Sequence, residues 1–230
     1  MSAVQPESQP FTRHLFSSAC DCPTKLFYKA QPDTYPEKKE QLPFLAHIRY
    51  NKRQLRQLLQ LCYPQGIHVK ERDYQKGARE TADLLKEEYA IIFHASFLNN
   101  NLFARVPVLE KDGNRVRVFH LKTKAFNPKR HSLTDRNQNL HSKWRGYIRN
   151  FAYLSYVIGQ NHPEWKLEPY LVLPDKTATA EINCLDQKLS NGYKIDPKKV
   201  SKLLAFVDVQ DQINRFLSGK ESIVEEDWRL

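Results

Sequence analysis

The chain has 230 residues, of which 40% are hydrophobic, so it is long enough for one domain with a real core. It contains no run of about 18 apolar residues, and its polar start, MSAVQPESQP, lacks the basic and apolar regions of a signal peptide. We therefore expect no membrane span and a cytoplasmic protein. The net charge of +10 makes nucleic acid a partner to consider, although charge alone does not establish one.

The first third of the chain predicts helices, loops and one short strand. A clear amphipathic helix opens at Asn51, because Leu55, Leu58, Leu59 and Cys62 follow at helical spacing. The other expected elements are a disordered segment at 1–10, a short helix within 11–28 with Ser17 or Ser18 as its cap, a strand at 67–69 and a helix at 74–88.

Residues 92–124 predict three strands at the centre of the fold. The pattern alternates in 92–97, is apolar and β-branched in 102–109, and alternates again in 115–121. The last two strands are joined through Asp112-Gly113, a strong hairpin signal because type I′ turns need residues that tolerate positive φ.

The second half of the chain predicts a long helix and one good strand. An apolar stripe at helical spacing runs from Leu140 to Ser155, and residues 165–174 have the pattern of a strand. Trp144 and Tyr147 on this helix could stack on nucleic-acid bases, but aromatic residues in such a stripe more often belong to the core. A helix pair is expected at 196–217.

Positive charge is concentrated in 28 residues, from Lys122 to Arg149, where eight basic residues and one acidic residue give a net charge of +7. If these side chains share a face, they predict salt-sensitive binding of phosphate groups. The alternative is an ordinary solvated basic surface. The basic residues are Lys122, Lys124, Lys129, Arg130, Arg136, Lys143, Arg145 and Arg149, and the acidic residue is Asp135.

Five short motifs occur in an order and at distances that resemble the RecB-like branch of the PD-(D/E)XK nuclease superfamily, in particular an uncharacterised bacterial family related to CRISPR-adaptation nucleases. The resemblance covers residues 16–187 and implies an α/β (α+β) fold with a restriction-endonuclease-like core, in which helices flank a mixed central β-sheet. The motifs are CPTKLFY (22–28), IFHASF (92–97), ARVPVL (104–109), VFHLK (118–122) and EPYLVLPDK (168–176).

The acidic residues of the family pattern are missing from this chain. That pattern has a Glu in the first central strand, an Asp in the next strand and Glu-x-Lys in the third. It also has an Asp and, four residues on, a Gln in the following helix. The residues at these positions here are His94, Pro107, His120, Lys122, Asn150 and Leu154, so only the lysine remains.

This replacement predicts a catalytically silent site. Mg²⁺ and Mn²⁺, which an active relative would need, prefer carboxylate oxygens facing the scissile phosphate. Pro107 has no side-chain ligand, and a lone Lys122 cannot both activate water and stabilise the leaving oxygen. We therefore expect no metal site and no cofactor.

Two alternatives could restore a metal. Glu110 and Asp112 at the turn end of the hairpin could act as a displaced carboxylate site, and His94 with His120 could begin a transition-metal site because imidazole suits such metals. The competing interpretation is that both histidines are packed core residues.

The cysteines do not predict a disulfide framework. Cys22 matches the position where related nucleases place the first ligand of an iron–sulfur cluster, but the family's further ligands near the C-terminus are absent. An iron–sulfur cluster is therefore not expected, and the thiols should stay reduced. The four cysteines are Cys20, Cys22, Cys62 and Cys184.

Three hypotheses of function follow. The first is a nucleic-acid-binding protein, with DNA preferred over RNA, on an inactivated nuclease-like fold. The second is an active metal-dependent DNA nuclease with a rearranged site, and the third is a structural or regulatory protein that pairs with an active relative. The expected organisation is a disordered start at 1–10, a nuclease-like domain at 11–187 and a helical extension at 188–230, as in a shortened or truncated relative.

Overall fold

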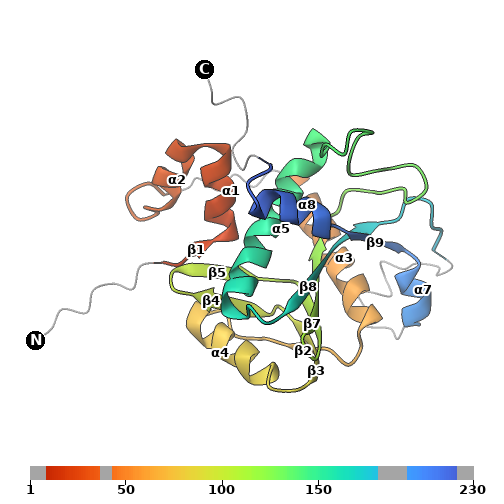
Figure 1. Cartoon of the computed structure of the whole chain (residues 1–230), viewed down its shortest axis with the longest axis horizontal. Coiled ribbons are helices and arrows are strands. Elements are labelled where there is room, and N and C mark those ends of the chain that lie inside the picture. Colours follow the sequence, from red (N-terminus) through yellow and green to blue (C-terminus); the bar gives the residue numbers. More distant parts are fainter. Residues whose placement is uncertain (1–8, 37–42, 181–195, 222–230) are drawn as a thin grey trace, which may run out of the picture.

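Two mixed β-sheets form the framework of the computed structural model, which describes residues 9–36, 43–180 and 196–221 (Figure 1). The larger sheet has the order β2-β3-β6-β7-β8-β9, and the smaller has the order β1-β5-β4. The strands are β1 Phe11–Thr12, β2 Ile67–His68, β3 Tyr89–Phe93, β4 Ser96–Asn99, β5 Leu102–Arg105, β6 Val108–Asp112, β7 Arg115–Leu121, β8 Lys166–Pro174 and β9 Leu204–Asp208.

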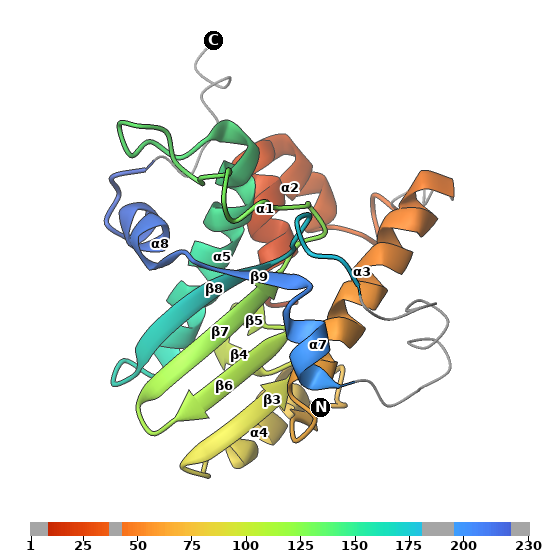
Figure 2. The same ribbon diagram turned by 90° about the vertical axis from the view of Figure 1, so that its right-hand side faces the viewer.

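Helices cover both faces of the larger sheet, as the sequence predicts (Figure 2). Residues of α5 and α8 share one hydrophobic cluster with β3, β6, β7 and β8, and residues of α3 share a second cluster with the opposite face of the same strands. The helices are α1 Arg13–Asp21, α2 Pro23–Lys29, α3 Pro43–Cys62, α4 Tyr74–Leu84, α5 Ser142–Asn161, α7 Pro197–Ser201 and α8 Gln210–Leu217.

The predicted hairpin is confirmed as β6–β7, but its turn differs from the predicted type. Asp112 pairs with Arg115, so the loop consists of Gly113 and Asn114. Only Gly113 of these two has a positive φ, +58°, and it occupies the first central position. This is the arrangement of a type II′ turn, which needs glycine at that position only.

The stretch predicted as one strand at 92–97 is two strands that belong to different sheets. His94 adopts a left-handed backbone with φ of +62°, and the chain passes there from β3 into β4. The partner stretch 102–109 divides in the same way into β5 and β6. Hydrogen bonds from the His94 N–H to the Pro107 carbonyl (3.0 Å) and from the Val106 N–H to the Ala95 carbonyl (2.9 Å) keep the two stretches paired across the break.

Helix α5 is the central helix of the fold and connects β7 to β8, which run parallel. A parallel pair needs such a crossover connection. Trp144, Ile148, Phe151 and Leu154 are each at most 1% exposed, so the apolar stripe seen in the sequence is confirmed as core. Trp144 therefore cannot stack on a base in this arrangement.

The predicted helix pair at 196–217 is wrong at its centre. Residues Leu204–Asp208 form β9, which pairs antiparallel with β8 at the edge of the larger sheet, between the short helix α7 and α8. Its apolar residues face two sides, since Leu204 joins the cluster under α3 while Ala205 joins the cluster around α5. Residues 196–221 thus complete the main sheet and are not a separate helical extension. The predicted boundary at 187 and most of the predicted disordered start lie outside the described residues.

The remaining sequence predictions for helices differ mainly at their ends. The helix expected from Asn51 begins at Pro43, and the cap of α1 is the Thr12 hydroxyl rather than Ser17 or Ser18, which lie inside the helix. No helix in the described ranges is long and apolar enough to cross a membrane.

Two glycines give a test of the local backbone. Gly159 lies in α5 and Gly113 has a left-handed φ, and a Cβ atom at either position would meet nothing within 4 Å. We expect Gly159→Ala to raise the free energy of unfolding by about 0.5–1 kcal/mol, the helix propensity difference. Gly113→Ala should lower it by about 1 kcal/mol because of its φ. Urea unfolding measures the change in the free energy of unfolding for each variant. The same change in both variants would contradict the assigned turn.

Candidate anion-binding site

The third strand of the central stretch, β7, ends beside three of the positions that the sequence singled out. Val116 and Val118 of β7 and Leu109 of β6 face the α5 side of the sheet. Alternation along a strand then sets His120 and Lys122 on that side. Val108 pairs with Phe119, so one further step in the same register sets Pro107 opposite His120. Pro107, His120 and Lys122 therefore share one end and one face of the sheet.

His94 does not join this group. Its ring lies 6.0 Å from the ring of His68, and its pKa is lowered to about 4 by burial and by the charges of Arg56, His68 and Arg105. The left-handed backbone at His94 ends the alternation that would have set its side chain in line with the other positions. A transition-metal site formed by His94 and His120 is therefore not supported.

His120 is a buried neutral side chain. It is 5% exposed and packs on Phe151 with a ring-centroid distance of 5.1 Å, and among the described residues neither ring nitrogen has a hydrogen-bond partner. Burial, together with the charges of Lys122 and Arg13, lowers its pKa well below the usual value. The predicted alternative of a packed core histidine describes its position, but the missing partners leave a buried polar ring unsatisfied.

Lys122 lies between two helices that also carry positive charge. Burial lowers the pKa of its ammonium group to about 7, and the charges of Arg13 on α1 and Lys52 on α3 act in the same direction. Its Nζ atom lies 4.5 Å from the ring centroid of Tyr147 on α5, a contact that favours the charged form. Burial and the two cations outweigh this contact because an unpaired charge loses several kcal/mol of hydration when it is desolvated.

No carboxylate in the described part of the chain forms an ion pair with Arg13, Lys52 or Lys122. Arg13 is partly buried, and burial lowers its pKa as well. Lys124 extends the positive charge, with its Nζ atom 5.0 Å from the ring centroid of Trp144. We call Arg13, Lys52, Lys122 and Lys124 the cationic site.

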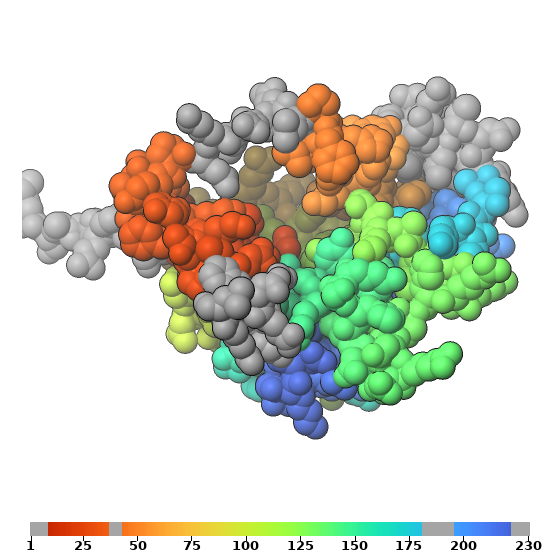
Figure 3. Space-filling model, turned by 90° about the horizontal axis from the view of Figure 1, so that it is seen from above, coloured from red at the N-terminus to blue at the C-terminus, as the bar shows by residue number. Residues whose placement is uncertain are grey.

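The surface is hollowed at this end of the molecule (Figure 3). The view from above shows a depression between α1–α2, in red and orange, and α3, also in orange, with the chain after β7 and α5 in green along its rim. The four residues of the cationic site come from the elements that surround this depression.

Two residues of the predicted basic surface are structural instead. Arg149 is 2% exposed and donates to Asp21 at 2.7 Å, which ties α5 to α1. Arg145 donates to Glu221 at 3.3 Å, next to Arg215 of α8. Acidic residues distant in sequence thus pair with Arg145 and Arg149, and binding of nucleic acid by these two residues stays a prediction.

The other predicted basic residues lie at the N-terminal end of α5 and in the loop before it. Lys143 lies 5.9 Å from the Trp144 ring, close to Lys124. The charges of Lys176, which follows β8, and of Lys143 lower the pKa of His131, after the effect of burial. Lys129, Arg130 and Arg136 are exposed in the loop. These residues form an outer margin to the cationic site.

The displaced carboxylate alternative is not supported. Glu110 accepts hydrogen bonds from Arg117 at 2.9 Å and from the hydroxyl of Tyr89, and Arg117 also lies 3.8 Å from Glu168. In the strand register Glu110 pairs with Arg117, which precedes Lys122 by five residues along β7. At 3.3 Å per residue, Glu110 is therefore about 17 Å from Lys122. Asp112 lies further still, at the turn.

The described residues contain no group of three or more His, Cys, Asp and Glu side chains that could hold a metal ion. Among the described residues, Cys20, Cys22 and Cys62 form no disulfide bond, and burial raises the pKa of Cys62 to about 11. Cys184 lies outside the described residues.

The helix positions matched to acidic and amide residues are also occupied differently. Leu154 is fully buried, and Asn150 is 8% exposed. The Asn150 amide donates to the Ser17 hydroxyl at 3.4 Å, while its Oδ1 atom has no partner. Asn150 and His120 are thus two buried polar side chains with unsatisfied atoms, both packed in the layer between the sheet, α5 and α1.

Sequence reasoning missed Arg13 and Lys52. Each precedes the central stretch by many residues, and Lys52 lies in a helix that also carries Arg49, Arg53 and Arg56 but no acidic residue. The available signal was this run of basic residues, but the sequence alone does not show that α3 lies next to the end of the sheet.

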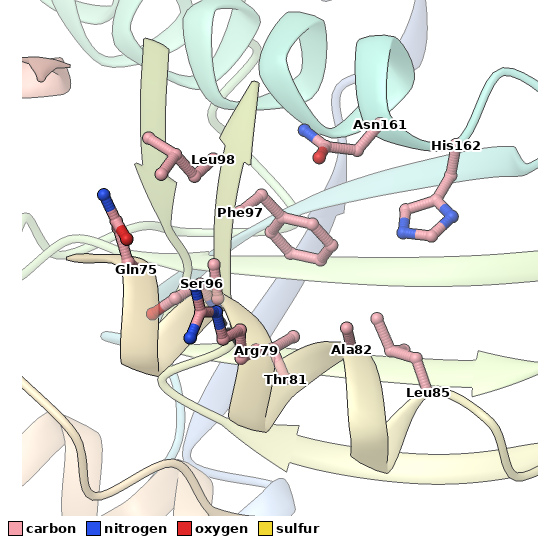
Figure 4. Close-up of a pocket in the computed structure, with 11 residues that line it drawn as sticks. Gln75, Arg79, Thr81, Ala82, Leu85, Ser96, Phe97, Leu98, Asn161 and His162 are labelled. Carbon is pink, nitrogen blue, oxygen red and sulfur yellow. Dashed lines mark hydrogen bonds between the residues drawn. The ribbon is translucent and has the colours of Figure 1, made fainter. Parts of the chain in front are cut away.

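A second cleft, of about 330 Å³, lies between α4, β4 and the C-terminal end of α5 (Figure 4). The polar groups at its floor are hydrogen-bonded to each other, because the Thr81 hydroxyl donates to the Gly77 carbonyl and accepts from the Ser96 N–H. His162 at its rim stacks on Trp165 at 3.7 Å. Asn161, which ends α5 and also lines the cleft, lies about 21 Å from Tyr147 along the helix at 1.5 Å per residue, so this cleft is separate from the cationic site.

Comparison with family models, with curated proteins and with solved structures gives no match for this chain.

Proposed function

We propose that this chain is a cytoplasmic nucleic-acid-binding protein, with DNA preferred over RNA, built on a PD-(D/E)XK nuclease-like fold without catalytic activity. The observation that supports this most is the cationic site, which lies where the resemblance implies catalytic carboxylates. Arg13, Lys52 and Lys122 converge there without an acidic partner among the described residues. A site that keeps its cations and lacks its acids suits phosphate binding and not metal-assisted hydrolysis.

The positive charges of the cationic site repel one another. Bringing several cations together while burying one of them lowers stability, and the lowered pKa of Lys122 reflects that cost. A phosphate backbone offsets it, because its negative charges compensate the cations and release bound counterions. The same cluster without an anion would have no favourable electrostatic role.

The topology is consistent with the resemblance. In chain order the core runs from α4 through the antiparallel strands β3, β6 and β7 to α5 and then β8, parallel to β7. This is a helix, three strands, a helix and a strand, with the cationic site at the end of the third strand. The arrangement supports a nuclease-like core as the source of the proposed binding.

The proposal is tested by fluorescence anisotropy with single- and double-stranded DNA and RNA at two salt concentrations, with cleavage followed in parallel in Mg²⁺ and Mn²⁺. We expect binding that weakens steeply with salt and leaves the substrate intact. Lys52→Gln and Lys122→Gln should each weaken binding by about 3–10-fold and reduce the magnitude of the salt slope by about 1.

Lys166→Gln is the matched control, because Lys166 pairs with Arg115 at the opposite end of β7. It should leave affinity within about twofold of the native protein, since exposed charges more than about 10 Å away are screened at 0.1 M salt. Equal losses in all three variants would show a diffuse basic surface and contradict the cationic site. Cleavage that requires Mg²⁺ or Mn²⁺ would overturn the absence of catalysis.

A protein partner is the second candidate, and an exposed apolar group on α3 favours it. Phe44 is 69% exposed, Leu45 is 38% exposed and Tyr50 is 38% exposed, all in the N-terminal half of this helix. Exposed apolar groups of this kind commonly mark interaction surfaces. Analytical ultracentrifugation of the native chain and of Phe44→Ser would detect association of the chain with itself.

A further inference from the structure

Lys122 has the surroundings of an amine nucleophile. It lies at the carboxyl end of β7, next to the buried His120, and over the ring of Tyr147 at 4.5 Å. Arg13 and Lys52 supply like charge from two helices, and no carboxylate in the described ranges forms an ion pair with it. A lysine is activated as a nucleophile when it is desolvated or lies next to other cations, because both disfavour the ammonium form.

A second observation points to a ligand at this position. His120 is 5% exposed, and both of its ring nitrogens lack hydrogen-bond partners within the described part of the chain. The Oδ1 atom of Asn150 on α5 is also buried without a partner. Buried polar groups of this kind are normally satisfied. A polar ligand that enters beside Lys122 would provide partners that the protein itself does not.

We propose that Lys122 forms an imine with an aldehyde that carries a phosphate group. The phosphate accounts for Arg13 and Lys52, and the aldehyde accounts for an amine that lacks an acidic partner. Two sources share this chemistry, the ring-opened abasic sugar of a nucleic acid and a free phosphorylated aldehyde. The proposal goes beyond nucleic-acid binding, and the free aldehyde tests it without any nucleic acid.

The reaction balances without an oxidant or a metal. The lone pair of Lys122 Nζ attacks the carbonyl carbon, a C–N bond forms, and a proton passes from nitrogen to oxygen to give a carbinolamine. Loss of the hydroxyl group with the remaining N–H proton as water gives the imine. Only the unprotonated amine can react, and the lowered pKa of about 7 keeps a substantial fraction of Lys122 in that form at neutral pH.

The experiment uses the full chain with pyridoxal 5′-phosphate, followed by borohydride reduction and peptide mass spectrometry. Reduction converts the imine to a stable secondary amine, so the modified lysine can be identified. We expect modification at Lys122, with a rate that rises with pH to a midpoint near 7. Lys122→Arg keeps the charge and removes the nucleophile, so it should reduce trapped product at least 10-fold.

Two comparisons separate the parts of the proposal. Lys166→Arg is the matched control, because Lys166 pairs with Arg115 at the opposite end of β7, and it should retain the trapping. Pyridoxal, which lacks the phosphate, should react at least several-fold more slowly than its phosphate ester. An abasic oligonucleotide and an intact one, each treated with borohydride, show whether the nucleic-acid source is used, and only the abasic strand should be trapped.

Modification spread over many lysines, or a rate midpoint near 10, would overturn the proposal. The proposed nucleic-acid binding fails by a different result, the absence of salt-dependent anisotropy. Trapping of pyridoxal 5′-phosphate without binding of nucleic acid would support the nucleophile and reject the binding function. Binding without trapping at Lys122 would do the reverse.

Discussion

Lys122→Met is expected to raise the free energy of unfolding at pH 7 by on the order of 2 kcal/mol, an unusual gain for replacing a lysine in a protein of this size. The folded chain holds the pKa of Lys122 near 7, whereas the ordinary value is 10.5. Methionine fills a similar volume and carries no charge. The expected gain of about 2 kcal/mol is about half of the free energy that corresponds to the full pKa difference, because the Lys122 side chain is only partly buried and water screens its charge.

The same residue gives a pH dependence with a defined sign. Between pH 7 and 10.5 the unfolded chain binds a proton at Lys122 that the folded chain lacks, so the stability of the native protein should increase with pH. The increase should be absent in Lys122→Met. Measurements should stop near pH 8.5. The Cys62 pKa, raised to about 11 in the fold, makes stability fall as pH passes its unfolded value of 9.0.

Urea unfolding at pH 7.0, 7.75 and 8.5 measures both effects. Lys124→Met serves as the control, because Lys124 follows Lys122 by two residues and makes a similar contact with an aromatic ring, that of Trp144. It should change stability by no more than about 0.5 kcal/mol, as surface substitutions generally do. Parallel pH profiles for the native chain and Lys122→Met would show that Lys122 is not the group responsible.

The central strands show what a sequence pattern can and cannot reveal. The strand regions and the hairpin are confirmed, because alternation and the Asp-Gly signal arise from local side-chain chemistry. The break at His94 had no such signal. A left-handed backbone is uncommon for histidine, and the ladder hydrogen bonds continue across it, so the alternation in the sequence looks unbroken. The consequence is large, because His94 leaves the face that carries His120.

Strand β9 was missed for a different reason. The apolar residues Leu203, Leu204 and Val207 have the spacing of a helix, and five residues are too few to separate the two periods. Pairing with β8 decides the outcome. A sheet edge selects a strand from a short ambiguous segment, and this tertiary contact is not visible in the segment itself.

The basic run shows the limit of charge counting. Eight basic residues lie close in sequence, but Arg149 pairs with Asp21 and Arg145 pairs with Glu221, partners that are far away along the chain. Ion pairs across such distances depend on how helices pack and cannot be derived from local charge. Conversely, Arg13 and Lys52 belong to the cationic site although both lie far from this run along the chain.

Placing carboxylates at the sheet end is expected to create divalent metal binding. Pro107 and His120 lie opposite each other by strand register and on the same face as Lys122. In the double variant Pro107→Asp/His120→Glu, two carboxylates would lie next to a lysine, the combination that the resemblance implies for active relatives. Without metal, two buried acids should destabilise the fold, since His120 is only 5% exposed.

Addition of Mn²⁺ should then stabilise the double variant and leave the native chain unchanged. A metal present at 100 times its Kd adds about 2.7 kcal/mol to the free energy of unfolding. For a chain of this length that corresponds to a rise in Tm of about 5–10 °C. Differential scanning calorimetry with and without EDTA measures the shift.

The neutral variant Pro107→Asn/His120→Gln has nearly the same shape and separates charge from packing. It should show no response to Mn²⁺. If both double variants respond equally, positions 107 and 120 do not face a common site, and the register argument for the sheet end is wrong. A response confined to the acidic variant would show that positions 107 and 120 face a common site and that this end of the sheet has the geometry for a metal.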